Sequence, residues 1–490
     1  MNITEGLRRI ARDRPDAAAI VCAGAIEGVP DGRVYTCAAL DRVVDAIAIR
    51  AAGWNLEPGK HVSLLFRRHL PMLLLRLGLA RAGIPMCNIP AFDDAGVRVV
   101  LHDADPVQGV RTIVADPAWW SEESDVPAPM HAGGEALLVR QATSGSVGEP
   151  KVVLVTHAMF AARWSGLFAW MPPPRSPRTM CTIGPGGGPA LGYLLNTLEA
   201  GGTAVVAGQV EGLLPYIERD RVSLLLTNPR GAADIIEMQP AGAAPPPALE
   251  QVVLTGARVT AALARLVSER LCANVVNSYA STEAGLISAG PATTLASIDG
   301  ATGYAHAGVE VEIVSAEGTV LPPGAKGIVR VRAPGQAAAY HRDPALSARV
   351  FRDGWVYTGD LGTVAEDGMI VISGRVDDLI NLGGSKLAPE IVENVLLRVP
   401  GVREAAAFGV PDALGKPVLH AAIVADEAVD VASIEAAFRA EPHSVPPSVV
   451  LRVPHLPRNE MGKLVRRALV DYVVSMRAAR PERPLRDPPQ

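Results

Sequence analysis

The stretch from Thr143 to Val152 has the composition of a phosphate-binding loop. It reads Thr-Ser-Gly-Ser-Val-Gly-Glu-Pro-Lys-Val, so hydroxyl side chains and two glycines precede a Pro-Lys pair. Glycine lets a backbone approach an anion without a Cβ in the way, and the hydroxyls add donors. The apolar run 152–155 follows directly, which predicts a loop at the edge of a strand. Its spacing differs from the nucleotide loop of kinases and GTPases, and taken alone the segment also fits a polar surface turn.

Four later segments carry groups that could complete a nucleotide site. They combine carboxylates and cations with small or aromatic neighbours, and they read Asn-Ser-Tyr-Ala-Ser-Thr-Glu at 277–283, Tyr-Thr-Gly-Asp at 357–360, Gly-Arg-Val-Asp-Asp at 374–378 and Leu-Pro-Arg-Asn-Glu-Met-Gly-Lys at 456–463.

Together the five segments resemble the adenylate-forming superfamily of acyl-CoA synthetases, nonribosomal-peptide adenylation domains and beetle luciferases. The order of the five segments and the intervals between them match the family over nearly the whole chain. Their residues are most similar to those of acyl- and aryl-CoA ligases. The resemblance implies an enzyme whose bound carboxylate attacks the α-phosphate of ATP, giving acyl-AMP and pyrophosphate. Such a site needs a phosphate cradle, a divalent cation and a further cation near the reacting oxygens.

The resemblance assigns the phosphates and the metal to the first two segments. The cradle for the β- and γ-phosphates would comprise Thr143, Ser144, Gly145, Ser146, Gly148 and Lys151. Thr282 would bond the α-phosphate. Glu283 would hold Mg²⁺, a hard cation that prefers oxygen ligands.

Adenine would lie against the segment 277–283. The resemblance implies that Tyr279, which follows Asn277 and Ser278, stacks on the base. It also implies that the small-residue turn Gly256–Ala257 lets the base lie flat. A buried core aromatic is the alternative for Tyr279.

The ribose would be bound by Asp360, because a carboxylate can accept hydrogen bonds from both vicinal hydroxyls. Arg375 would support the ribose or a phosphate. An ordinary turn aspartate and a surface arginine are the respective alternatives.

Lys463 is predicted to act in the adenylation step. In the family the matching lysine arrives with a mobile C-terminal domain and stabilises charge that develops in the transition state. A solvated lysine in a basic run is the alternative. Asp377 resembles the pivot of that domain, and Gly383–Gly384 resemble the glycine pair lining the tunnel for a thiol, either CoA or a carrier protein's phosphopantetheine.

The glycine run Gly186, Gly187 and Gly188 is predicted to open space beside the acyl group. No acidic residue lies between Cys181 and Leu198, which disfavours an α-amino acid because its ammonium would be buried without a partner. Other predicted acyl-pocket residues are Trp164, Ala280 and Gly285. Arg230 could pair with a second substrate carboxylate, although a surface or structural role fits it better.

Bulk properties limit the partners. A 490-residue chain with 49% hydrophobic and 20% charged residues can bury a core and suggests at least two domains. The net charge of −5 gives no reason to propose nucleic acid or an anionic membrane. Scattered cysteines and the lack of an apolar N-terminal stretch favour a soluble cytoplasmic protein.

Hydrophobic periodicity predicts an α/β fold. Helices are expected at 38–51 and 70–82, alternating with buried strands at 62–66, 203–206, 222–226 and 251–254, which implies parallel sheet flanked by helices. Period-two segments at 309–313 and 328–332 predict a more antiparallel subdomain. A strand at 369–373, a helix from about 389, strands near 405–410 and 420–424 and a helix from about 433 follow.

The predicted domains are 1–374 for ATP and acid binding, a hinge at 375–378, a small mobile α+β domain at 379–476 and a disordered tail at 477–490.

The sequence is compatible with two enzymatic functions. The first is an acyl- or aryl-CoA synthetase acting on a small carboxylic acid. The second is a freestanding adenylation enzyme that loads an acyl carrier protein. A scaffold that has lost catalysis is a third possibility, against which Lys463, Glu283 and Asp360 argue.

Overall fold

In a computed structural model, the chain forms two compact units. The structure describes residues 1–26, 28–64, 69–87, 95–101, 109–130, 132–143, 151–208, 212–240, 242–292, 298, 300–382, 385–411, 417–441, 444–458 and 464–479. Of these, the larger unit holds 1–143, 151–358 and 363–372, and the smaller unit holds 359–362 and the residues from 373 onward. The hinge at 375–378 and the mobility of the C-terminal domain stay predictions.

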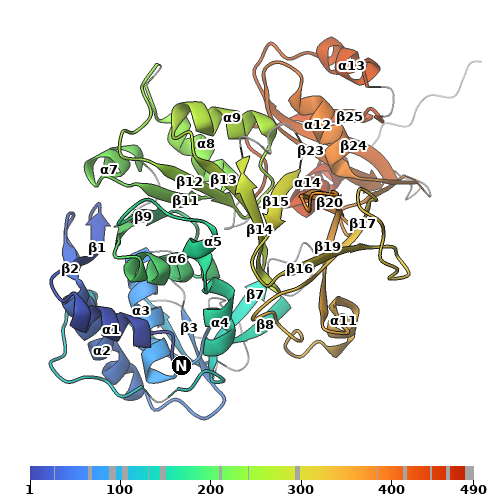
Figure 1. The fold of residues 1–490 in the computed structure, drawn as a ribbon. Coiled ribbons are helices and arrows are strands. Elements are labelled where there is room, and N and C mark those ends of the chain that lie inside the picture. The colour runs from blue at the N-terminus through green and yellow to red at the C-terminus, as the bar shows by residue number, and fades with distance from the viewer. Residues whose placement is uncertain are drawn as a thin grey trace, which may run out of the picture. The chain divides into compact units, whose positions relative to one another are not determined.

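One long sheet organises the larger unit (Figure 1). Its parallel centre consists of β13 (Val275–Ser281), β12 (Gln251–Thr255), β11 (Leu224–Thr227), β9 (Arg178–Cys181), β10 (Thr203–Ala207) and β1 (Ala18–Ala23), in that spatial order. β2 (Val34–Thr36) closes one edge antiparallel to β1. These strands consist almost entirely of apolar residues, as expected for a sheet that is buried on both faces.

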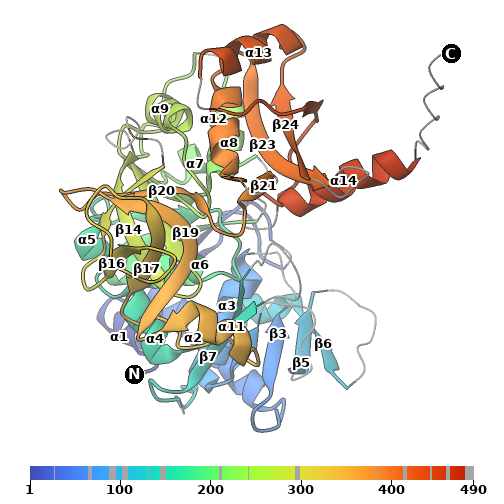
Figure 2. The ribbon, with the colours of Figure 1, turned by 90° about the vertical axis from the view of Figure 1, so that its right-hand side faces the viewer.

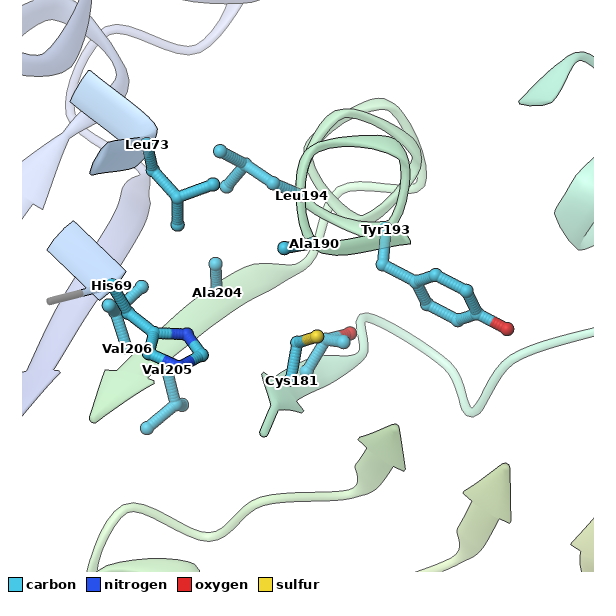
Figure 3. A pocket seen from close by; sticks show the side chains of 10 residues that line it. His69, Leu73, Cys181, Ala190, Tyr193, Leu194, Ala204, Val205 and Val206 are labelled. Carbon is cyan, nitrogen blue, oxygen red and sulfur yellow. The ribbon is translucent and has the colours of Figure 1, made fainter. Parts of the chain in front are cut away.

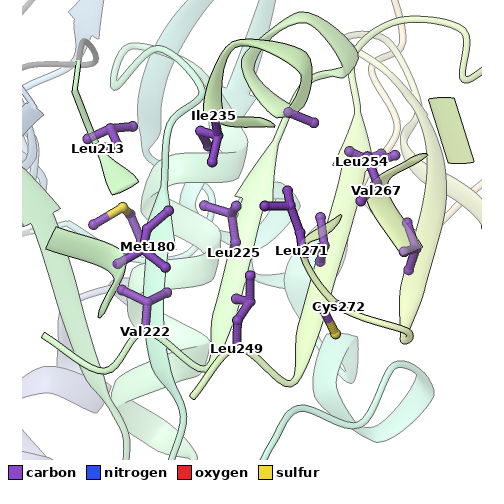
Figure 4. Packing of buried hydrophobic residues seen from close by; sticks show 14 of the residues in the cluster. Met180, Leu213, Val222, Leu225, Ile235, Leu249, Leu254, Val267, Leu271 and Cys272 are labelled. Atoms are coloured by element: carbon purple, nitrogen blue, oxygen red, sulfur yellow. The ribbon is translucent and has the colours of Figure 1, made fainter. Parts of the chain in front are cut away.

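Helices cover the two faces of this parallel centre. On one face, α7 (Leu214–Arg219), α8 (Pro229–Glu237) and α9 (Ala261–Arg270) pack with the strands into a buried cluster. Figure 4 shows Ile235 and Val267 from two of these helices meeting Leu225 and Leu254 from the strands. On the other face lie α6 (Gly188–Glu199) and α3 (His69–Ala82).

Beyond β13 the sheet becomes antiparallel. β14 (Gly285–Pro291) and β15 (Ala301–Ala305) follow, and β20 (Ile370–Arg375), β19 (Trp355–Val364), β17 (Gly327–Arg332) and β16 (Glu310–Val314) continue the order. The short β18 (Phe351–Arg352) pairs with β19, and α11 (Pro344–Val350) precedes it.

A second sheet in the larger unit carries the strand on each side of the predicted phosphate loop. Its order is β6 (Arg111–Val114), β5 (Ala95–Val100), β3 (His61–Leu64), β4 (Met86–Cys87), β7 (Leu137–Thr143) and β8 (Lys151–Thr156). Its neighbours in sequence are α1 (Glu5–Asp13), α2 (Cys37–Ala52), the 3₁₀ helix η1 (Pro117–Trp120), α4 (His157–Trp164) and α5 (Leu167–Trp170).

Several helices begin where a polar side chain caps the first turn. Thr36, Thr156 and Thr260 accept hydrogen bonds from Ala39, Met159 and Leu263 N–H groups, which start α2, α4 and α9. Each cap satisfies a backbone donor that the helix itself cannot pair.

The smaller unit is a three-layer α+β arrangement. β23 (Val402–Pro411) pairs antiparallel with β24 (Pro417–Ala425), which pairs parallel with β25 (Val449–Arg452). Alternate strand residues pack against α12 (Pro389–Leu397) and α13 (Val431–Arg439) on one face and against α14 (Arg466–Ala479) on the other (Figure 2). The hairpin β21 (Ile380–Leu382) and β22 (Ser385–Leu387) precedes α12.

The predicted α/β class is confirmed, and the predicted elements are found within a few residues of their expected bounds. Helix 38–51 corresponds to α2, helix 70–82 to α3, and the period-two segments to the antiparallel pair β16–β17. The predicted tail begins within α14, which extends to Ala479, and its remainder lies outside the described residues.

A buried histidine at the start of α4 makes the stability of the larger unit depend on pH. His157 is fully buried, and its Nδ1 accepts a hydrogen bond from the Ile3 N–H at 3.3 Å. Burial lowers the pKa of His157 from 6.5 to about 4, and burial lowers that of His69 to about 4 as well. Between these values the unfolded chain binds protons that the folded chain does not, so stability falls as pH drops from 6.5 towards 4.

We predict that His157→Asn removes about half of this pH dependence, because asparagine keeps an acceptor near Nδ1 but does not titrate. A shift of this size corresponds to the order of 3 kcal/mol when fully developed. Urea unfolding midpoints at pH 7 and pH 4.5 measure it, with the exposed His455→Asn as control. Equal losses of stability in wild type and His157→Asn would rule this explanation out.

Candidate functional site

Three of the predicted site segments follow parallel strands at the same edge of the large sheet, in which β12 and β13 are neighbours and β11 lies between β12 and β9. The loop at 182–187 follows β9, the turn Gly256–Ala257 follows β12, and the turn at 282–284 follows β13. Gly256 has φ +89°, in the region that favours glycine. Ligands of open α/β sheets bind at this carboxyl edge, so the fold brings these segments together where a ligand can reach them.

The buried guanidinium of Arg163 in α4 fixes the turn after β13. Its Nη1 donates to the carbonyl of Thr282 at 3.1 Å, and its Nη2 donates to that of Glu283 at 3.2 Å. Its Nε donates to the Gly335 carbonyl at 2.7 Å, and burial lowers the pKa of Arg163 to about 10. The predicted acyl-pocket residue Gly285 has φ +85°, and a Cβ there would meet Arg163 Cγ at 2.9 Å.

The carboxylate of Glu283 fits a site for a hard cation. Its Oε1 accepts a hydrogen bond from the Tyr340 hydroxyl at 2.7 Å, and no ion pair to it is found in the described part of the chain. Among the described residues no group of three or more His, Cys, Asp or Glu could hold a metal by protein ligands alone. A single carboxylate supplemented by phosphate oxygens is a common way to bind Mg²⁺.

Of the predicted phosphate loop, the structure describes the residues at its two ends, Thr143 and Lys151. Thr143 at the end of β7 is the register partner of Lys151 at the start of β8, so these two backbone positions lie side by side. The predicted cradle residues Ser144, Gly145, Ser146 and Gly148 lie outside the described residues.

Residues of the predicted adenine-binding segment 277–283 form hydrogen bonds with other strands of the sheet. Asn277 Nδ2 donates to the Ala301 carbonyl at 2.9 Å, and the Ser278 carbonyl accepts from Thr255 Oγ1 at 3.0 Å. Tyr279 is half-buried against an apolar cluster, and Ala280 pairs with Leu286. Stacking of Tyr279 on adenine stays a prediction.

The two residues predicted near the ribose form an ion pair in the smaller unit, and their contact with a ribose stays a prediction. Arg375 Nη1 donates to Asp360 Oδ1 at 2.9 Å, and Asp360 is only 6% exposed. The Val376 N–H donates to the Gly359 carbonyl at 2.8 Å, which ties the strand carrying Asp360 to the residue after Arg375. The predicted pivot Asp377 is next in the chain, whereas Gly383, Gly384 and Lys463 lie outside the described residues.

The acyl-side residues meet around α6. Trp164 is buried against the start of this helix, where Gly188 faces it, and its ring lies 6.0 Å from that of Tyr193. Gly192 makes this packing possible, since a Cβ there would lie 2.2 Å from Trp164 Cδ2. Gly186 and Gly187 belong to the loop that precedes α6.

A small cavity lies between α3, α6 and the strands β9 and β10 (Figure 3). His69 and Leu73 of α3, Cys181 of β9 and Tyr193 of α6 line it, and its volume of about 20 Å³ holds roughly one water molecule. Burial raises the pKa of the Cys181 thiol to about 12 and raises that of the Tyr193 phenol, so both groups are neutral near pH 7.

Arg76 in α3 orders the glycine-rich loop. Its side chain is 2% exposed, and Nη1 donates to the carbonyls of Pro185 at 2.6 Å and Gly187 at 2.7 Å. Burial lowers the pKa of Arg76 to about 10. Arg230, by contrast, pairs with Asp234 one helical turn away at 2.8 Å on an exposed face.

The fold and these site segments are those of enzymes that use a nucleotide to activate an acid. Residues 7–341 match the AMP-binding enzyme family, and residues 391–463 match the AMP-binding enzyme C-terminal domain. The chain belongs to this family of adenylate-forming enzymes and is an AMP-forming ligase.

Curated relatives agree with this assignment, and solved structures share the fold. A feruloyl-CoA synthase from Amycolatopsis is 30% identical over 404 residues, covering 78% of this chain and 82% of its own. The fatty acid–[acyl-carrier-protein] ligase ScoC of Streptomyces coeruleorubidus is 27% identical over 94% of each chain. The ATP-bound structure of MatB from Rhodopseudomonas palustris has a TM-score of 0.82 at 23% identity, covering 97% of this chain and 100% of that one.

Three residues of the site were not predicted from the sequence: Arg163, Tyr340 and Arg76. Each is a single residue outside the five segments, and each acts on a segment distant in sequence, such as Tyr340 on Glu283. Arg76 was the one visible sign, because it interrupts the apolar run of the helix expected at 70–82, where Arg81 is the other charged residue, and a buried charge requires partners.

We predict that Arg76→Met raises the KM for the acid about tenfold and leaves the KM for ATP unchanged. Hydrogen bonds from a charged donor contribute about 1.5–3 kcal/mol each, and a tenfold change requires about 1.4 kcal/mol. Acid-dependent ATP–pyrophosphate exchange measures both constants. Arg230→Met is the control and should change neither, so equal effects of the two substitutions would contradict a role for Arg76 in ordering the loop.

Proposed function

We propose that this enzyme activates a medium-sized organic or aromatic acid with ATP and transfers the acyl group to the thiol of CoA. The observation that carries the proposal is the turn at 282–284, where Arg163 fixes the backbone and the Glu283 carboxylate forms no ion pair with the described residues. A metal–triphosphate complex is the type of ligand that such a turn can bind.

The chemistry has two half-reactions. A carboxylate oxygen of the acid attacks the α-phosphorus of ATP, the bond to the bridging oxygen of the β-phosphate breaks, and pyrophosphate leaves. The CoA sulfur then attacks the carbonyl carbon of acyl-AMP, the thiol proton is released to solvent, and AMP leaves with the oxygen that had joined the acid to phosphorus.

The residue roles are proposed from the positions of the matching segments. Thr282 bonds the α-phosphate, Glu283 holds Mg²⁺, and the loop between Thr143 and Lys151 cradles the remaining phosphates. Mg²⁺, when bound, neutralises phosphate charge. Lys463 stabilises the charge that develops at the α-phosphate during adenylation.

The smaller unit supplies the proposed ribose and thiol residues. Asp360 accepts from the ribose hydroxyls, and its pairing with Arg375 fixes the orientation of the carboxylate. Asp377 serves as pivot, and Gly383–Gly384 line the path of the thiol.

The class of acid is supported by the glycine-rich loop and by the relatives. The stretch 182–198 offers no carboxylate for a substrate ammonium, and neutral or aromatic residues such as Trp164 and Tyr193 lie beside it. The relative named for feruloyl-CoA makes an aromatic acid a sensible first substrate to test. We propose a cytoplasmic location, because the five cysteines are scattered along the chain without a Cys-x-x-Cys pair. No helix in the described part of the chain has the length and apolarity to cross a membrane.

Transfer to an acyl carrier protein is the second candidate function. It is favoured by the relative that covers 94% of this chain, which is named for an acyl-carrier-protein ligase. Both functions share the first half-reaction and differ in the carrier of the thiol.

We predict that free CoA accelerates acid-dependent AMP release at least tenfold. The enzyme, its best acid and ATP are incubated with CoA, with a phosphopantetheinylated carrier protein, or with dephospho-CoA as a matched thiol control. Thioester formation with CoA supports the first proposal. Acceleration by the carrier alone would establish the second function instead.

A further inference from the structure

The side chain of Glu283 is held by a neutral partner. Tyr340 donates its phenolic proton to Oε1 at 2.7 Å, and this is the hydrogen bond that the described residues make to the carboxylate. A phenol orients a carboxylate without cancelling its charge, whereas lysine or arginine in the same place would form an ion pair.

The main chain of Glu283 is fixed independently. Its carbonyl accepts from Arg163 Nη2 at 3.2 Å and from the Ala337 N–H at 2.8 Å. With the backbone and Oε1 both fixed, the position of Oε2 is defined although it takes no part in these bonds.

Tyr340 is itself positioned by the strand that starts at Lys151. It forms an isolated antiparallel bridge with Val153, and the next residue, His341, donates its N–H to the Val152 carbonyl at 2.7 Å. The ring of Tyr340 is 6% exposed and packs edge-on against Phe351 with centroids 5.1 Å apart.

The same ring also lies near Lys151, the described residue that ends the predicted phosphate-binding segment. Lys151 Nζ lies 5.9 Å from the ring centroid of Tyr340, within the range of a cation–π contact. Tyr340 therefore contacts both a residue of the predicted phosphate-binding segment and the carboxylate expected to bind the metal.

We propose that Tyr340 is a positioning residue that holds Glu283 so that its second oxygen can bind the divalent cation accompanying ATP. The inference rests on the proposed function, because it takes Glu283 as the metal ligand. Groups that orient metal ligands through hydrogen bonds typically contribute 10–100-fold to metal affinity.

The test is Tyr340→Phe, which removes one oxygen atom and keeps the ring against Phe351 and Lys151. Binding of α,β-methylene ATP, which cannot release pyrophosphate, is measured by calorimetry on the full chain with Mg²⁺ and with EDTA. We expect affinity with Mg²⁺ to fall about tenfold or more and affinity with EDTA to be unchanged. Equal affinities of wild type and variant in Mg²⁺ would overturn the inference, and so would an equal loss under both conditions.

Control variants separate this inference from the proposed function. Tyr304→Phe removes another tyrosine-to-carboxylate bond, to Asp367, at an exposed site and should change neither affinity. Glu283→Gln should lose the Mg²⁺ effect. If Glu283→Gln binds like wild type, the metal role in the proposed function fails; if only Tyr340→Phe binds like wild type, this inference alone fails.

Phe351→Leu provides a second variant that leaves the phenol in place but loosens its ring. It should weaken Mg²⁺-dependent binding less than Tyr340→Phe does, and the unfolding midpoint reports whether either variant disturbs the fold. An effect on the midpoint together with unchanged Mg²⁺-dependent binding in both variants would assign Tyr340 a structural role only.

Discussion

The buried guanidinium of Arg163 is the interaction on which the candidate site depends. Three backbone carbonyls, from two segments more than fifty residues apart in the sequence, converge on this one side chain. Because a charge without water must be surrounded by acceptors, the same bonds that satisfy Arg163 also fix the turn that carries Thr282 and Glu283. The glycine at 285 leaves the space that the arginine stem fills.

A common pattern links the larger unit's site residues. Arg163 and Arg76 each direct their protons at carbonyl oxygens of a loop, and each loop follows a parallel strand at the carboxyl edge of the sheet. Tyr340 adds a side-chain contact from a third segment. Rigid strands therefore set the positions of the loops, and buried donors set their shapes, which is the preorganisation that binding of a charged ligand requires.

Much of the fold could be predicted from the sequence because its elements have strong local signals. The periodic helix at 38–51 and the apolar runs at 203–206 and 251–254 are found as α2, β10 and β12. The parallel order of these strands then brings Gly256, Thr282 and the glycine-rich loop to one edge. The resemblance of the five motifs to adenylate-forming enzymes identified the family, which the comparisons confirmed.

The supporting residues could not be predicted because they have no local signal. Tyr340 lies in a segment without regular structure, and its importance depends on a bridge to Val153, nearly two hundred residues earlier. Asn277, predicted beside adenine, donates to the Ala301 carbonyl of β15, a contact that depends on the position of Ala301 after folding. Such contacts follow from tertiary structure and not from periodicity.

Isotope transfer from the acid to AMP tests acyl-adenylate formation most directly. The enzyme is given an acid labelled with ¹⁸O in both carboxylate positions, together with ATP, Mg²⁺ and the thiol acceptor, and the products are analysed by mass spectrometry. Attack of the carboxylate on the α-phosphorus predicts one labelled oxygen in AMP and none in pyrophosphate. Unlabelled AMP, or label in inorganic phosphate released with ADP, would contradict activation of the acid as its adenylate.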